Sequence, residues 1–84
     1  MIMKEDIQRF KLYLESYCLN GVIYTNDYKL KEVKDKPTNS YINDISLAET
    51  ISNEISKTDN IEELELIACK INDILKNQNP GELL

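Results

Sequence analysis

The chain has 84 residues, a formal net charge of −5 and 42% hydrophobic residues. This length makes one domain, which buries about 60–65% of the surface that the unfolded chain exposes and therefore has modest stability. It has no histidine, two cysteines and two glycines, which argues against histidine acid–base chemistry, a closed zinc site and a glycine-rich phosphate loop. The sequence shows neither an apolar run of membrane-spanning length nor a secretory signal at its start, so we expect a cytoplasmic protein with no membrane contact.

The first helix is predicted over residues 4–19. The apolar side chains of this segment share an arc of about 100° on the helical wheel: Met3, Ile7, Phe10, Leu14, Tyr17 and Cys18. Asn20 and Gly21 should end the helix, because glycine readily takes the left-handed conformation. Leu12 and Leu19 lie on the opposite side, so either the following hairpin or another chain is expected to cover them.

A β-hairpin is predicted over residues 22–33, with its turn at Asn26-Asp27. A two-residue turn would give the pairs Thr25–Tyr28, Tyr24–Lys29 and Ile23–Leu30. In that register Tyr24 shares a face with Lys29 and Lys31, and Lys34 follows nearby in a polar loop over residues 34–43. These four residues are the candidate nucleic-acid contact, since lysines can bind phosphates while an aromatic ring stacks on a base. A solvated hairpin edge is the simpler interpretation.

Two further helices are predicted, over residues 46–57 and 60–77. Capping boxes at Ser46–Glu49 and Asp59–Glu62 would start them. The apolar stripe of the second helix contains Leu47, Ile51 and Ile55. The stripe of the third covers about 140° and contains Ile61, Leu64, Ile67, Ala68, Ile71, Ile74 and Leu75. The very short connection between the two helices predicts an antiparallel pair, and residues 78–84 form a tail.

These elements predict a single domain over residues 1–84. Its fold class is α+β, mostly α, in the order helix, β-hairpin, helix, helix, with the three helices on one core. Helix 46–57 and helix 60–77 lie in the more acidic half of the chain. Residues 43–84 hold three basic and nine acidic side chains, whereas residues 1–42 hold seven basic and six acidic ones.

The sequence contains no catalytic signature, and we expect no enzyme, cofactor or metal. Cys18 lies on the apolar arc near a helix C-terminus, where the dipole disfavours a thiolate, and Cys69 lies in mid-helix. Two reduced thiols are favoured over a Cys18–Cys69 disulfide. Glu62 and Asp73 lie on the same side of their helix but three turns apart, too far to share a proton.

Leu66 lies opposite the apolar stripe of its helix, among Glu62, Asp73 and Lys70. We therefore predict a non-enzymatic interaction protein that binds a basic protein partner, with acids steering the association and leucines anchoring it. The most specific form of this prediction is inhibition of a nucleic-acid-handling enzyme. The partner-binding residues would be Leu66, Glu62, Asp73, Leu12 and Leu19.

Two alternative functions remain. One is a nucleic-acid-binding or transcription-regulating protein that uses the hairpin lysines, although a sequence pI near 4.6 opposes DNA binding. Another is a structural homo-oligomer subunit. A homodimer through the first helix is also expected, because Leu12 and Leu19 could be buried twice across a two-fold axis.

Residue usage suggests an origin for the chain. Nine lysines against one arginine, with abundant isoleucine and asparagine, are typical of AT-rich genes. In size, acidity and residue usage the chain resembles small accessory proteins of phages and mobile elements, such as anti-restriction or anti-CRISPR inhibitors and immunity proteins. No motif carries this likeness, and no family is identified.

Overall fold

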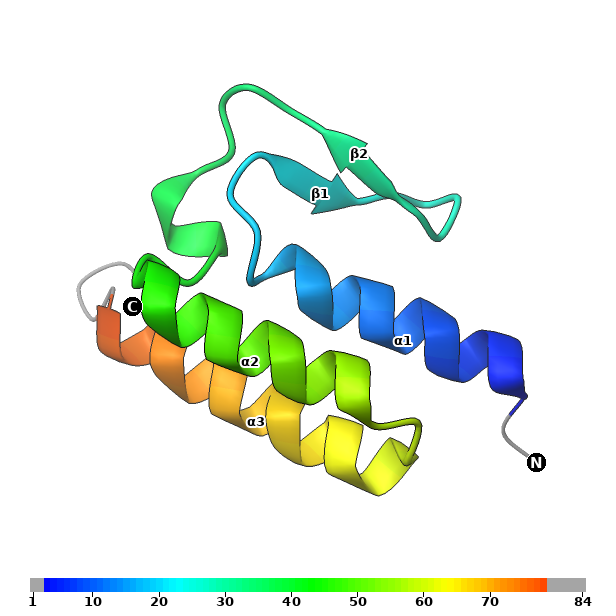
Figure 1. Ribbon diagram of the computed structural model, residues 1–84. Helices are drawn as coiled ribbons and strands as arrows, with labels where there is room; N and C mark the ends of the chain where they lie inside the picture. Colours follow the sequence, from blue (N-terminus) through cyan, green and yellow to red (C-terminus); the bar gives the residue numbers. More distant parts are fainter. Residues whose placement is uncertain (1–2, 79–84) are drawn as a thin grey trace.

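The computed structural model describes residues 3–78, which form three α-helices, a two-stranded antiparallel hairpin and a short 3-10 helix (Figure 1). In chain order the elements are α1 (Lys4–Ser16), β1 (Val22–Tyr24), β2 (Leu30–Glu32), η1 (Thr38–Ser40), α2 (Ile45–Lys57) and α3 (Ile61–Gln78). The predicted α+β, mostly α, fold class and its element order are confirmed. Residues 79–84 of the predicted tail lie outside the described part, and residue 78 still belongs to α3.

The helices α2 and α3 run antiparallel and are joined by a short turn, while α1 packs against both of them (Figure 1). The hairpin lies along α1, on the side away from the α2–α3 pair. A three-helix layer therefore carries the core, and the hairpin is an added layer on α1 alone.

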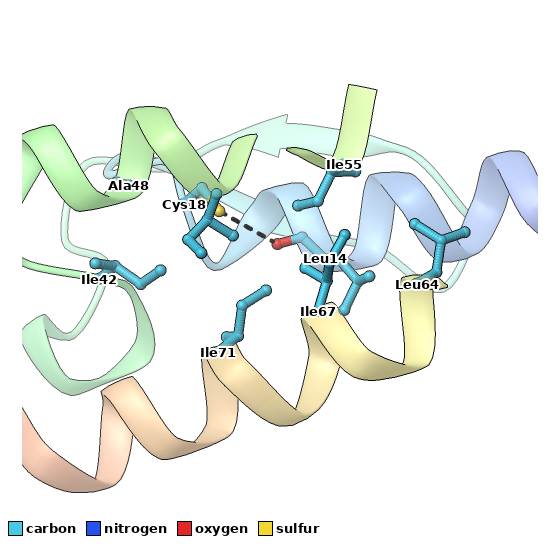
Figure 2. Close-up of a cluster of buried hydrophobic side chains, with 9 residues drawn as sticks. Leu14, Cys18, Ile42, Ala48, Ile55, Leu64, Ile67 and Ile71 are labelled. Carbon is cyan, nitrogen blue, oxygen red and sulfur yellow. Dashed lines mark hydrogen bonds between the residues drawn. The ribbon is translucent and has the colours of Figure 1, made fainter. Parts of the chain in front are cut away.

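The core contains at least one residue from each helix, together with Ile42 from the segment before α2 (Figure 2). Its buried members are Leu14, Cys18, Ile42, Ala48, Ile51, Ile55, Leu64, Ile67 and Ile71. On α2 and α3 these residues recur every three or four positions, so each helix turns one apolar side inward. Burying each large aliphatic side chain contributes about 1.5–3 kcal/mol.

Helix α1 ends three residues earlier than predicted. It stops at Ser16 because the next amides, of Tyr17 and Cys18, bond to carbonyls three residues back, which tightens the last turn into 3-10 geometry. Gly21 takes a φ of +91°, which redirects the chain into β1.

The segment after the hairpin closes the C-terminal end of α1. The amide of Ile42 donates to the carbonyl oxygen of Tyr17 at 2.7 Å. The Lys36 ammonium donates to the carbonyl oxygens of Ser16 and Leu19. The carbonyl groups that the end of α1 leaves unpaired thus accept hydrogen bonds from residues some twenty positions later in the chain. These contacts fix the predicted loop over residues 34–43 in place.

Both predicted helix caps are wrong by one or two residues. The N-cap of α2 is Asp44, whose side chain accepts from the Leu47 amide at 3.1 Å, so the helix begins before Ser46. Before α3, the Asn60 side chain accepts from the Glu62 amide at 2.8 Å, and Asp59 is released from that role. Aspartate and asparagine cap as well as serine does, so the type of capping residue alone does not fix where either helix begins.

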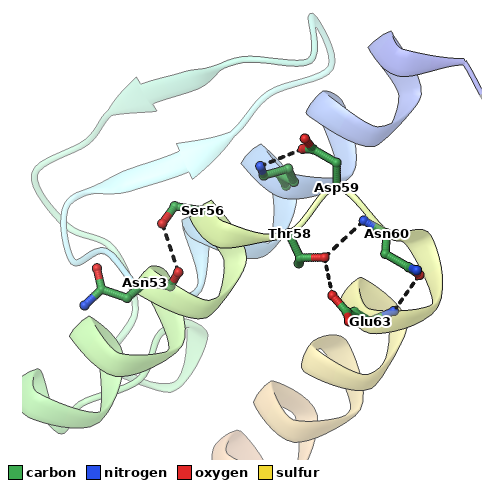
Figure 3. Close-up of polar contacts among 7 residues, drawn as sticks. Asn53, Ser56, Thr58, Asp59, Asn60 and Glu63 are labelled. Atoms are coloured by element: carbon green, nitrogen blue, oxygen red, sulfur yellow. Dashed lines mark hydrogen bonds and ion pairs between the residues drawn. The ribbon is translucent and has the colours of Figure 1, made fainter.

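The turn between α2 and α3 is held by its own side chains (Figure 3). Thr58 Oγ1 accepts from the Asn60 amide at 3.1 Å and donates to the Glu63 carboxylate. Asp59 instead forms an ion pair with Lys11, at 3.0 Å, which ties the turn to α1.

The predicted hairpin register is wrong by one residue. Tyr24 pairs with Leu30, and Ile23 pairs with Lys31. Beyond the strands the Thr25 amide still donates to the Lys29 carbonyl, so residues 26–28 form a loop of three residues rather than two. The Tyr28 amide bonds to the Thr25 carbonyl, and Tyr28 itself takes a φ of 61°. A two-residue type I′ turn needs two positive φ angles, which Asn26-Asp27 without glycine disfavours, whereas a type I turn followed by one left-handed residue needs only one.

Candidate protein-interaction surfaces

The outward side of α3 carries the predicted binding residues Glu62, Leu66 and Asp73, together with Cys69; we refer to these four as the α3 outer face. They recur at helical spacing opposite the buried stripe, so the same periodicity that builds the core places them in solvent. Leu66 is 70% exposed, and the other three residues are also exposed. The structure therefore brings together three of the five predicted partner-binding residues.

The charges of the α3 outer face are acidic and open to a partner. Within residues 3–78, Glu62 and Asp73 take part in no ion pair. The neighbouring ammonium of Lys70 is directed toward α2, where it lies 3.2 Å from each carboxylate oxygen of Glu54. An exposed leucine thus sits between acids that this part of the chain does not neutralise.

The other two predicted residues, Leu12 on α1 and Leu19 three residues after its end, lie elsewhere. Leu12 is half-buried within the single chain, and Leu19 is 39% exposed. The hairpin lies along this helix, where the ring of Tyr24 stands 5.5 Å from that of Tyr13. The hairpin packs along α1 but leaves Leu19 exposed, and neither leucine joins the α3 outer face.

The hairpin residues predicted to contact nucleic acid are divided by the observed register. Lys29, Lys31 and Lys34 are exposed. Lys31, however, pairs with Ile23, whereas half-buried Tyr24 is on the alternate face and turns toward α1. The predicted combination of Tyr24 with Lys31 on one face is not formed.

Both cysteines are free. Cys18 lies in the core, and burial raises the pKa of its thiol to about 11, with a further contribution from Glu15. A protonated, enclosed thiol is a poor nucleophile. Residues 3–78 hold no group of three His, Cys, Asp or Glu side chains placed to bind a metal ion. None of the helices in this range combines the length and apolar character that crossing a bilayer requires.

Sequence reasoning missed a groove of about 640 Å³ where the end of α1, the segment 38–43 and the first half of α2 meet. Its apolar lining includes Leu19, Tyr41, Ile42, Ile45 and Ala48. The sequence signals were Leu19, predicted to lie opposite the apolar arc of the first helix, and Ile45, an apolar residue outside the predicted stripe of α2, which proves 76% exposed.

The segment 41–43 that forms one wall of this groove is held by Gln78 at the end of α3. The Gln78 side chain donates to the Tyr41 carbonyl at 2.6 Å and accepts from the Asn43 amide at 3.1 Å. No sequence pattern signals this contact, because it joins positions more than thirty residues apart.

Comparison of the chain with protein-family models, with curated proteins and with solved structures gave no match in any of the three.

Proposed function

We propose that this chain is a non-enzymatic interaction protein that binds a basic protein partner through the α3 outer face. The observation that carries the proposal is Leu66, 70% exposed between Glu62 and Asp73. A single exposed leucine is ordinary on a protein surface. The acidic surroundings of Leu66 support its role as an anchor, since interface anchors are apolar side chains ringed by groups that steer and orient the partner.

The sharpest form of the proposal is inhibition or regulation of a nucleic-acid-handling enzyme in the cytoplasm, in the manner of a phage or mobile-element accessory protein. A groove that accepts phosphates presents basic side chains. Acids spaced along a rigid helix can occupy it, and the chain's net charge of −5 favours the encounter.

Cys69 provides a specific test. It is exposed on the α3 outer face, whereas Cys18 is 7% exposed with a raised pKa, so a thiol-reactive photo-crosslinker should attach at Cys69 alone. Photolysis in a lysate of the source cells should link the chain to a protein with a basic surface. The crosslink should be lost in the Leu66→Lys variant.

The matched control moves the crosslinker to α2, as Cys69→Ser with Ser56→Cys; Ser56 is also exposed. This control should not capture the same protein. Equal capture from both positions, or capture that survives Leu66→Lys, would contradict the proposed surface.

A nucleic-acid-binding or transcription-regulating role is the second candidate, supported by the exposed ammonium groups of Lys29, Lys31 and Lys34. Titration of labelled duplex and single-stranded DNA at low salt separates it from the first. Submicromolar binding that disappears in Lys29→Glu/Lys31→Glu would reverse the order of the two candidates.

A further inference from the structure

The groove beside the end of α1 has an apolar floor that no helix within residues 3–78 covers. Ala48, Ile42 and Cys18 form this floor and are 5%, 3% and 7% exposed. Leu19 and Ile45 stand at its rim, where they are 39% and 76% exposed. A groove of about 640 Å³ falls within the range of roughly 300–1,000 Å³ that binding pockets occupy.

The groove exists because hydrogen bonds hold its walls apart while the side chain that α2 presents between them is small. Gln78 fixes segment 41–43 at the end of α3, and Lys36 ties the same region to the carbonyls that end α1. Between these walls α2 presents Ala48, which carries only a methyl group. The opening is therefore a property of a braced structure rather than of a loop free to close over it.

The charge at the groove has one sign. Among the lining residues the charged side chain is Glu49, which is exposed and forms no ion pair within residues 3–78. The nearby ammonium of Lys36 lies over the ring of Tyr41 but donates to the carbonyls of Ser16 and Leu19. A bound segment would meet an apolar floor, an acidic edge and several side-chain amides.

We infer that this groove binds a peptide segment of a protein partner in which an apolar side chain is flanked by lysine or arginine. The apolar side chain would lie on Ala48 between Leu19 and Ile45, and the basic group would pair with Glu49. A second copy of this chain fits less well, because it would bring another net charge of −5 to an acidic edge. The lining comes from residues 18–20 just after α1, from segment 38–43 and from α2, so this site is separate from the α3 outer face.

The test is an NMR titration of the ¹⁵N-labelled chain with a capped amphipathic peptide of leucine and lysine, and with its leucine–glutamate counterpart. The lysine peptide should shift the amide signals of Ile42, Ile45, Ala48 and Glu49, and the glutamate peptide should bind at least tenfold more weakly. Glu49→Lys and Ile45→Ser should each weaken the lysine peptide at least fivefold. Both residues are exposed, so these variants should fold.

Glu65→Lys is the matched control, an equal charge change at an exposed position of α3, and it should leave the affinity within twofold. Shifts confined to the signals of Glu62, Leu66 and Asp73, equal affinity for the two peptides, or no shift at millimolar peptide would overturn the inference. So would shifts of the groove signals on dilution of the chain alone, which would identify a second copy as the occupant. Shifts confined to the α3 outer face would support the first proposal while overturning this one, and the other outcomes leave the crosslink from Cys69 unaffected, so the two proposals fail separately.

Discussion

The Lys36 ammonium lies 2.9 Å from the carbonyl oxygen of Leu19, and it also donates to the carbonyl of Ser16. One side chain from the segment after the hairpin thus closes the C-terminal end of α1, where the helix dipole favours a positive charge. Burial lowers the pKa of Lys36, yet the carbonyl oxygens compensate the ammonium for lost water. This contact braces the wall of the groove.

Replacing Lys36 by methionine should therefore destabilise the fold. The variant keeps most of the aliphatic stem but loses two charge-assisted hydrogen bonds, which should cost about 1–3 kcal/mol in the free energy of unfolding measured with urea. Lys34→Met, at an exposed position two residues earlier, is the control and should change stability by less than about 0.5 kcal/mol. Equal effects of the two substitutions would show that the carbonyl contacts carry no stability.

The orientation of α3 is tested by a pair of substitutions on its two sides. Ile71 is 2% exposed, so Ile71→Ala should cost about 2–4 kcal/mol through lost burial and a residual cavity. Leu66 is 70% exposed, so Leu66→Ala should cost less than about 0.5 kcal/mol. Urea unfolding of both variants measures the difference, and similar losses would mean that α3 is rotated about its axis.

The buried thiol of Cys18 predicts a loss of stability at alkaline pH. Its pKa rises from 9.0 to about 11 in the folded chain, so the folded state holds the proton more tightly than the unfolded state does. The resulting stability is complete below pH 9 and is lost as pH rises to about 11. A shift of this size corresponds to about 2–3 kcal/mol.

Urea unfolding at pH 8 and pH 11 checks this prediction by comparing Cys18→Ala with Cys69→Ala, whose thiol is exposed. The Cys18 variant should lose less stability between the two pH values. Tyr17, whose pKa burial and the Tyr13 hydroxyl raise to about 12, adds a loss in the same direction in both variants. Identical losses in the two variants would contradict the assignment to Cys18.

The homodimer predicted from Leu12 and Leu19 stays a prediction. Since Leu12 is half-buried in the single chain, such a contact would depend on Leu19. Sedimentation at tens of micromolar should then give about twice the 9.8 kDa of one chain, and Leu19→Glu should restore the single mass. A mass of 9.8 kDa throughout would reject the dimer. Because Leu19 also borders the groove, a dimer of this kind would place a second copy there and would contradict the peptide proposal, so the sedimentation result decides between the two.

The helices were predictable from the sequence because their signal is local and repeated. On α3 seven apolar residues lie on one side of the helix. Because Leu66 lies opposite them, the same pattern predicted that it is exposed to solvent. The hairpin offered a shorter signal, and a single left-handed residue, Tyr28, moved the register by one position and separated Tyr24 from Lys31.

The groove was not predictable from the same patterns. It depends on Lys36 reaching back to α1 and on Gln78 holding Tyr41 and Asn43, contacts between residues 17 to 37 positions apart. Both side chains are polar and occur in stretches without periodicity. Ile45 shows the same limit, since an apolar residue beside a helix cap looks like core until the opposite wall of the groove is known.

The proposed anchor for a basic partner is Leu66, which lies between Glu62 and Asp73 on α3. The decisive measurement is a calorimetric titration with the purified, uncrosslinked partner that the Cys69 crosslink identifies. This partner is titrated against wild type, Leu66→Ser and Glu62→Lys, with Glu5→Lys on α1 as the charge control. Leu66→Ser should weaken binding roughly 30-fold, as loss of a buried anchor does. Glu62→Lys should weaken it more at low salt than at high salt, and Glu5→Lys should weaken it less than Glu62→Lys does. Wild-type affinity in Leu66→Ser would contradict the claim.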